Sequence, residues 1–162
     1  MKRYYSRERA WTGMERGRQM NRGNVLRSEG TEQEKVISWC YYHEPKYPDL
    51  KWLYHCPNGG SRNKTEAVNL KRQGVKAGVP DLHLPVPRGR YIGLYIELKY
   101  NKGRLQPSQR EWMDGMQAAG HFTCTCYGFD NAVKIIEEYI NLCAGTEMSV
   151  PNGAILKQEE NG

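Results

Sequence analysis

The sequence predicts an α/β fold with a mixed sheet flanked by helices, and three observations lead to that fold class. The chain has 162 residues, enough for one domain with a full hydrophobic core. Segments with helical periodicity alternate with segments rich in Ile, Leu, Val and Tyr, which are typical of strands. The resulting order is α, β, α, β, β, α, β, α, without an internal repeat.

The first three elements lie between residues 29 and 74. The apolar stripe of 29–42 predicts a helix, and Ser28 before it is a favourable N-cap residue. The segment "LKWLYHC" (50–56) predicts a strand that ends at "PNGG". The segment 63–74 predicts a short helix that ends at its last residue, a glycine.

The remaining elements are three strands and two helices. "PRGR" lies between the first two strands and predicts a hairpin. Pro107 suits the first position of a helix, and Asp130 is the predicted cap of the last one. The predicted strands are 78–86, 91–100 and 121–128, and the predicted helices are 107–119 and 130–143.

Charge and composition divide the chain into three parts. Residues 1–27 hold eight Lys and Arg side chains against two glutamates, which accounts for the whole net charge of +6. We expect 1–27 to be a disordered basic arm, 28–143 the folded domain and 144–162 a disordered tail. An Arg-rich arm with interleaved aromatic residues suits a phosphate backbone and stacked bases. The alternative is a solvated tail that does not contact nucleic acid.

The composition also excludes several classes of protein. No apolar run approaches the length of a membrane span, and the N-terminus lacks the apolar region of a signal peptide. The five cysteines are an odd number without a CxxC pair, which argues against a disulfide framework and for a reducing compartment. We therefore expect no membrane partner and a cytoplasmic location, in the host cytoplasm if the gene is viral.

An unusual group of charges lies on the two hairpin strands. Glu97 and Lys99 share one face of an otherwise apolar strand. If Gly89 is the centre of the hairpin, Asp81 lies directly opposite Glu97, about 5 Å away, where like charges destabilise a sheet. A divalent cation between the two carboxylates would remove the repulsion, and Lys99 could then reach a water or a phosphate oxygen. A bulge that shifts the register by one residue would break this arrangement.

Pro80-Asp81, fifteen further residues and Glu97-x-Lys99 resemble the motif of the PD-(D/E)XK nuclease superfamily. The resemblance covers about residues 28–141. Within the superfamily, the sequence is similar to the VRR-NUC branch in its stand-alone form, which is found in phages and bacteria. It implies an αβββαβ restriction-endonuclease-like core with an inserted helix after the first strand. The segments that carry it are "PNGGSRNK", "GVKAGVPDLHLPV", "GLYIELK", "GRLQPSQREW" and "GHFTCTCYGFDNAVKIIEEYI".

The resemblance also implies roles for residues at the site. Asp81, Glu97 and the backbone carbonyl of Leu98 match the ligands of Mg²⁺ or Mn²⁺, and Lys99 matches the catalytic lysine. The family places a further glutamate on the first helix. The spacing to Gln33 selects Glu29, but Glu32 lies one turn away and stays as the alternative.

Further residues match the region around the site. Gln109 corresponds to a family glutamine with a catalytic role, although Gln106 stands where a serine is more usual. The candidate DNA contacts are Asn58, Arg62, Lys64, Lys102 and Arg104.

The implied activity is metal-dependent hydrolysis of DNA that leaves a 3′-hydroxyl and a 5′-phosphate. We expect an endonuclease selective for branched or four-way (Holliday) junction DNA. The alternatives are a non-catalytic DNA-binding module of the same fold and an RNA-directed nuclease. We also expect a homodimer, with four aromatic residues as candidate interface that could equally be core or stacking residues: Tyr41, Tyr42, Trp52 and Tyr54.

Overall fold

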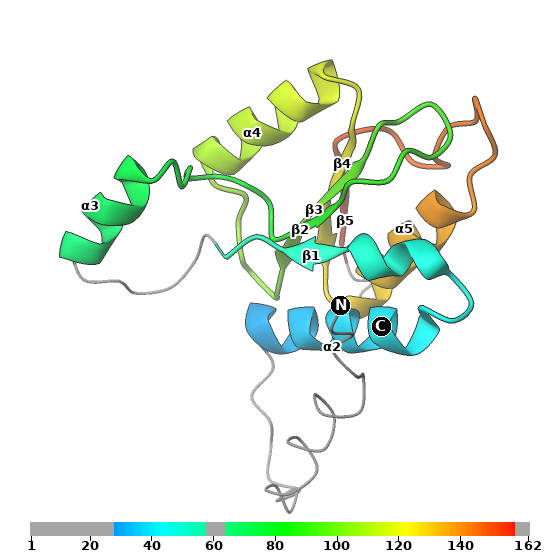
Figure 1. The fold of residues 1–162 in the computed structure, drawn as a ribbon, viewed down its shortest axis with the longest axis horizontal. Coiled ribbons are helices and arrows are strands. Elements are labelled where there is room, and N and C mark those ends of the chain that lie inside the picture. Colours follow the sequence, from blue (N-terminus) through cyan, green and yellow to red (C-terminus); the bar gives the residue numbers. More distant parts are fainter. Residues whose placement is uncertain (1–27, 58–63, 158–162) are drawn as a thin grey trace, which may run out of the picture.

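The computed structural model describes residues 28–57 and 64–157, except for the side chains of Lys64 and Ala67. The predicted basic arm and the predicted contacts Asn58 and Arg62 lie outside the described residues. The described part is a five-stranded mixed sheet with helices on both faces (Figure 1). In that part, no helix is long and apolar enough to cross a membrane.

The sheet has the strand order β1-β2-β3-β4-β5. The first two pairs are antiparallel, and β3-β4 and β4-β5 are parallel. This arrangement confirms the predicted αβββαβ core, with α3 as the inserted helix. The helices are α2 Glu29–His43, the 3-10 helix η1 Pro48–Trp52, α3 Lys64–Arg72, α4 Pro107–Ala118 and α5 Phe129–Ile140, and the strands are β1 Tyr54–His55, β2 Leu82–Leu84, β3 Leu94–Lys99, β4 Phe122–Tyr127 and β5 Ala154–Leu156.

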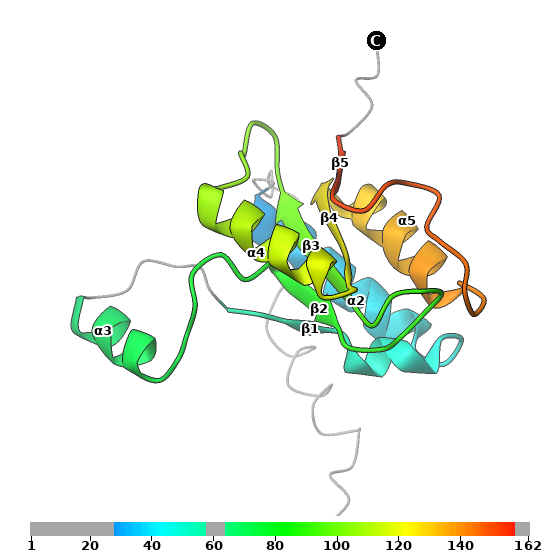
Figure 2. The same cartoon turned by 90° about the horizontal axis from the view of Figure 1, so that it is seen from above.

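The hydrophobic core lies on one face of the sheet. Helices α2 and α5 pack against each other and against β3 on this face, and α4 packs against β4 on the other (Figure 2). Every side chain of β3 is buried, because helices cover both faces of this central strand. The core residues include Val36, Cys40, Leu82, Leu84, Leu94, Ile96, Leu98, Phe122, Cys124, Cys126, Ile135, Ile136 and Tyr139.

The helix boundaries mostly follow the sequence signals. Ser28 caps α2 as predicted, since the Thr31 backbone N–H donates to its hydroxyl (3.2 Å) and the Ser28 N–H donates to the Thr31 hydroxyl (2.8 Å). Pro107 is the first residue of α4. The predicted Asp130 cap is wrong, because α5 begins one residue earlier, after Gly128.

The predicted strand over 50–56 is mostly wrong. Residues Pro48–Trp52 form η1 instead, and only Tyr54 and His55 pair with β2. Proline at the first position pre-sets the backbone angle of a helical turn, and Leu50 then enters the core.

The C-terminal segment also differs from its prediction as a disordered tail. Within the described residues 144–157, Met148 is buried and β5 adds a fifth strand beside β4. The Asn152 side chain accepts the Thr123 backbone N–H (2.8 Å), and the Asn131 side chain donates to the Leu156 carbonyl (3.2 Å). These long-range contacts hold a segment whose own sequence shows little strand character.

Candidate active site

The candidate site lies where β2 begins and β3 ends. Leu82 pairs with Ile96 in the antiparallel register, so Asp81 lies opposite Glu97 one residue further along. The predicted pairing of the two carboxylates is therefore confirmed, although the Arg88–Tyr91 bridge centres the turn between Gly89 and Arg90, one residue out of the β2–β3 register. The Asp81 carboxylate accepts the backbone N–H of Leu98 (2.8 Å), which fixes its side chain beside the end of β3.

Glu97 is the most enclosed charged group of the site. Its side chain is about 1% exposed, and its Oε1 accepts hydrogen bonds from Lys99 Nζ (2.6 Å) and from the Gln109 amide. Its Oε2 is buried without a hydrogen-bond partner among the described residues. A buried carboxylate oxygen in this state has lost its hydrogen bonds to water without gaining a donor from the protein.

Both carboxyl groups of the site have raised pKa values. Burial, helped by the negative charge of Asp81, raises the pKa of Glu97 to about 7. Burial also raises the pKa of Asp81, although the Leu98 N–H acts in the opposite direction. Burial alone would lower the pKa of Lys99, but the neighbouring carboxylates, Glu97 first, raise it above its ordinary value. The lysine therefore stays positively charged.

The start of α4 brings Gln109 to the site. The Gln106 backbone N–H donates to Gln109 Oε1 (2.8 Å), which leaves the amide nitrogen to bind Glu97. Gly78 sets how close the chain before β2 comes to this helix: an added Cβ would lie 2.2 Å from the Ser108 carbonyl oxygen, and its φ of +85° favours glycine.

The two candidate glutamates of α2 have different surroundings. Glu29 Oε1 lies 3.8 Å from Lys99 Nζ at the site. Glu32 is buried and accepts the backbone N–H of Phe129 (2.9 Å), the first residue of α5, and also binds Lys35 (2.6 Å). A carboxylate at a helix N-terminus is favoured by the helix dipole. The structure thus brings Glu29, and not Glu32, to the lysine.

Two residues beside the lysine were missed from the sequence. Gly103 lies so close that an added Cβ would be 2.8 Å from Glu29 Oε1 and 3.3 Å from Lys99 Cδ. Tyr127, the neighbour of Lys99 across the sheet, donates its hydroxyl hydrogen to the Gly103 carbonyl (2.7 Å). The glycine of "NKGR" was the available signal for such a close approach, but nothing in the sequence linked it to Tyr127.

The donor set fits a hard divalent cation. Among the described residues, no three His, Cys, Asp or Glu side chains gather as ligands, so the fit depends on two carboxylates and a carbonyl. The Lys99 carbonyl accepts Gly128 N–H on the β4 side (3.0 Å), so the Leu98 carbonyl, one residue earlier, points to the β2 side, toward Asp81. The opposed charges and the unpaired Glu97 oxygen are what such an ion would satisfy.

The other predicted positions are the candidate DNA contacts and the candidate interface aromatics. Lys102 and Arg104 are exposed on the loop that follows β3, next to the site, whereas Lys64 begins α3 and its side chain is not described. The four candidate interface aromatics are exposed, which excludes the alternative that they belong to the core: Tyr41, Tyr42, Trp52 and Tyr54.

Comparisons with known proteins agree with this geometry. The family model of the VRR-NUC domain matches residues 23–130. A solved structure titled "VRR_NUC domain protein" is 30% identical, with a TM-score of 0.65, and the match covers 76% of this chain and 98% of that chain. No curated protein matched the sequence. The chain therefore belongs to the VRR-NUC domain family, whose function is of the nuclease type in DNA processing.

Proposed function

We propose that the protein is a divalent-metal-dependent DNA endonuclease. The observation that carries the proposal is the pair of half-buried Asp81 and buried Glu97, opposed across the hairpin with the Lys99 amine bound to Glu97. Two opposed and desolvated carboxylates reduce the stability of a fold. Their placement beside a charged lysine at the end of a strand is explained by a catalytic role.

Asp81, Glu97 and the Leu98 carbonyl are the residues that would hold Mg²⁺ or Mn²⁺. When bound there, the ion supplies a Lewis acid for the scissile phosphate and lowers the pKa of a bound water. Glu29 lies in reach of the same lysine and is the proposed additional ligand from α2.

Lys99 acts as a charged donor in this proposal. In the protein without metal, the neighbouring carboxylates raise the pKa of the amine and favour its protonated form. It can orient the attacking water and neutralise the negative charge that develops on the phosphate. Gln109 holds the Glu97 carboxylate, and Tyr127 with Gly103 limits the movement of the loop after Lys99. In-line attack would leave a 3′-hydroxyl and a 5′-phosphate.

The proposed substrate is branched DNA, and the proposed assembly is a homodimer. One site of this kind cuts one strand, so two sites related by a two-fold axis could nick opposite strands of a four-way junction. The four exposed aromatics of α2, η1 and β1 support such an interface, because large aromatic residues are enriched where proteins associate. Light scattering should give about twice the chain mass of 18.7 kDa.

Glu97→Gln tests the activity. The variant keeps the shape of the side chain but loses its charge, so we expect it to bind DNA and to cleave at the background rate in Mg²⁺ or Mn²⁺. Glu34→Gln, on the exposed part of α2, is the matched control and should cleave like the unmodified protein. Each strand of a junction should be labelled in turn, with linear DNA and RNA in parallel reactions.

Cleavage by Glu97→Gln at the rate of the unmodified protein would contradict the proposed site. Cleavage by the unmodified protein in excess EDTA would contradict it as well. Binding without cleavage by the unmodified protein would favour a non-catalytic DNA-binding module. Preferential cutting of RNA would identify an RNA-directed nuclease.

A further inference from the structure

The inserted helix α3 and the residues that follow it stand away from the sheet (Figures 1 and 2). We propose that Lys71, Arg72 and Lys76 on this arm bind the phosphates of the DNA duplex that flanks the cleaved bond. The part of the inference that names DNA as the ligand rests on the proposed function. We call residues 64–77 the α3 arm.

The α3 arm lies beside the candidate site because of the sheet topology. The arm leads through Gly78, which touches the first turn of α4, directly to Asp81 at the start of β2. Since β2 and β3 are antiparallel, the start of β2 and the end of β3 lie at the same edge. Lys102 and Arg104 follow β3, so cationic segments leave the sheet on both sides of the carboxylates.

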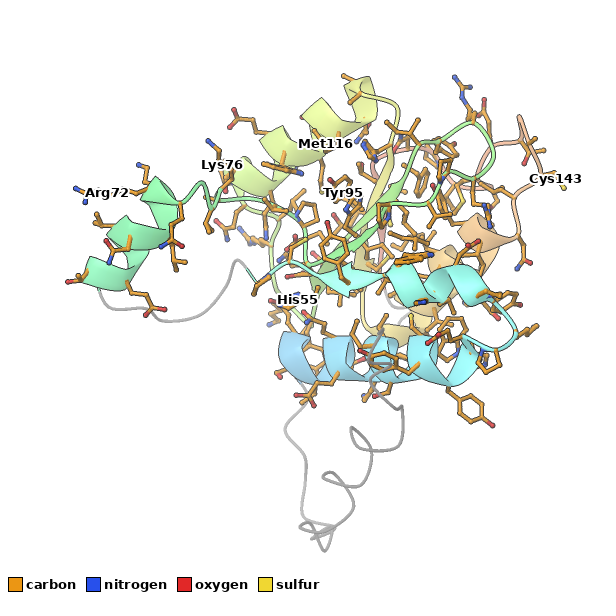
Figure 3. The ribbon with its side chains drawn as sticks, in the orientation of Figure 1. His55, Arg72, Lys76, Tyr95, Met116 and Cys143 are labelled. Carbon is orange, nitrogen blue, oxygen red and sulfur yellow. The ribbon has the colours of Figure 1, made fainter. Side chains whose placement is uncertain are left out.

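Packing does not explain the α3 arm. None of its described side chains is buried, and even Val68 is 51% exposed. A helix of nine residues has little stability by itself, because isolated helices need about 12–15 residues to form in water. Figure 3 shows Arg72 on the helix and Lys76 in the segment that approaches α4. The helix therefore adds surface next to the site and adds little to the core.

The charge of the α3 arm favours nucleic acid as its partner. Residues 64–77 contain four Lys or Arg and one glutamate, whereas 28–162 as a whole are close to neutral. Lys71 and Arg72 lie in the last turn of α3, where they also complement the helix dipole. Lys76 lies four residues beyond the helix, so the dipole does not account for it. Cations around a phosphodiesterase site supply affinity that depends strongly on salt.

A triple substitution tests the arm: Lys71→Gln, Arg72→Gln and Lys76→Gln. Glutamine has nearly the same helix propensity as Lys and Arg, so α3 should stay folded, which circular dichroism checks. The matched control removes three exposed cations from other parts of the surface: Lys46→Gln, Arg90→Gln and Lys134→Gln. Both triples are made in the full chain with Glu97→Gln, and a linear DNA duplex is the binding probe.

We expect the α3 triple to reduce the slope of log affinity against log salt by up to ~2.7, at about 0.9 for each phosphate that the arm no longer neutralises. The control triple should leave the slope unchanged. In the protein that keeps Glu97, the α3 triple should raise KM for DNA relative to the unmodified protein. It should leave kcat at saturating DNA unchanged, since the arm touches none of the reacting groups.

An equal reduction in the two triples would overturn the inference, because net charge alone would then explain the binding. An unchanged slope in the α3 triple would overturn it as well. The binding measurement needs no cleavage. An inactive protein that still shows the α3 effect would therefore contradict the proposed endonuclease and support the arm.

Discussion

Ile96 and Glu97 are neighbours on β3 and are each about 1% exposed, yet burial has opposite consequences for them. Ile96 points to α2 and α5 and joins the apolar core. Glu97 points to the other face, where burial opposes its charge and raises its pKa to about 7. The core face supplies the free energy that keeps the strand in place, and the opposite face uses that support to hold groups that would otherwise repel each other. Equal burial therefore stabilises the fold on one face and opposes a charge on the other, where the proposed site lies.

Truncation of the core face should have the largest effect on stability. Ile96→Ala should reduce the free energy of unfolding by about 2–5 kcal/mol, because it removes a buried side chain and leaves a cavity. Urea denaturation measures the change. Ile92→Ala is the control, since Ile92 lies just before β3 and is half exposed, and it should cost less than about 0.5 kcal/mol. Similar costs at the two positions would contradict the contrast.

Removing the charge of Glu97 on the opposite face should stabilise the metal-free protein. The Glu97 carboxyl has its ordinary pKa near 4.5 in the unfolded chain and about 7 in the folded one. Between these values the folded state keeps a proton that the unfolded state has released, so this group makes stability fall as pH rises. In EDTA at pH 8, Glu97→Gln should therefore be more stable than the unmodified protein, by up to about 3 kcal/mol.

Low pH and added metal should each change the difference in stability between Glu97→Gln and the unmodified protein. Near pH 4.5 and below, the advantage of Glu97→Gln should disappear, because both side chains are then neutral. Mg²⁺ or Mn²⁺ should raise the melting temperature of the unmodified protein more than that of the variant. A variant that is less stable at pH 8 in EDTA would show that the carboxylate stabilises the fold.

The two glutamates of α2 should separate stability from activity on a smaller scale. Glu32→Ala leaves the part-buried N–H of Phe129 without its charged acceptor and should cost about 1.5–3 kcal/mol. Glu29→Ala removes a half-exposed side chain and should change stability by less than about 0.5 kcal/mol while it reduces cleavage. Thermal denaturation and a cleavage assay on both proteins give the comparison. A Glu29→Ala protein with full activity would remove this residue from the proposed site.

The centre of the site could be predicted from the sequence because it depends on local pairing. Asp81 and Glu97 belong to two strands that follow each other in the chain, and the antiparallel pairing of these strands places them face to face. The faces of β3 follow from the alternation of a strand, so Glu97 and Lys99 had to lie together. The start of α4, with Gln109, and Glu29 of α2 come from other parts of the chain.

The parts that could not be predicted depend on distant partners. Glu29 and Glu32 lie one helical turn apart, and only the position of α5 decides which one turns away from the site. β5 has only three apolar residues, which follow Pro151 and Gly153, and this short segment becomes a strand because the edge of β4 is available. At 50–56, local turn chemistry at Pro48 overrode the apolar content that predicted a strand.

The bond between the Phe129 backbone and Glu32 spans 97 residues and joins the last helix of the domain to the first. On the ribosome, the hairpin with both carboxylates emerges well before β4 and α5. Until they follow, β3 has no parallel neighbour, Lys99 lacks Tyr127 beside it, and α2 lacks its packing partner α5. A nascent chain therefore carries the acidic pair without the frame that orders it. Under the proposed function, competence to cut nucleic acid would therefore arise only after β4 and α5 have been synthesised.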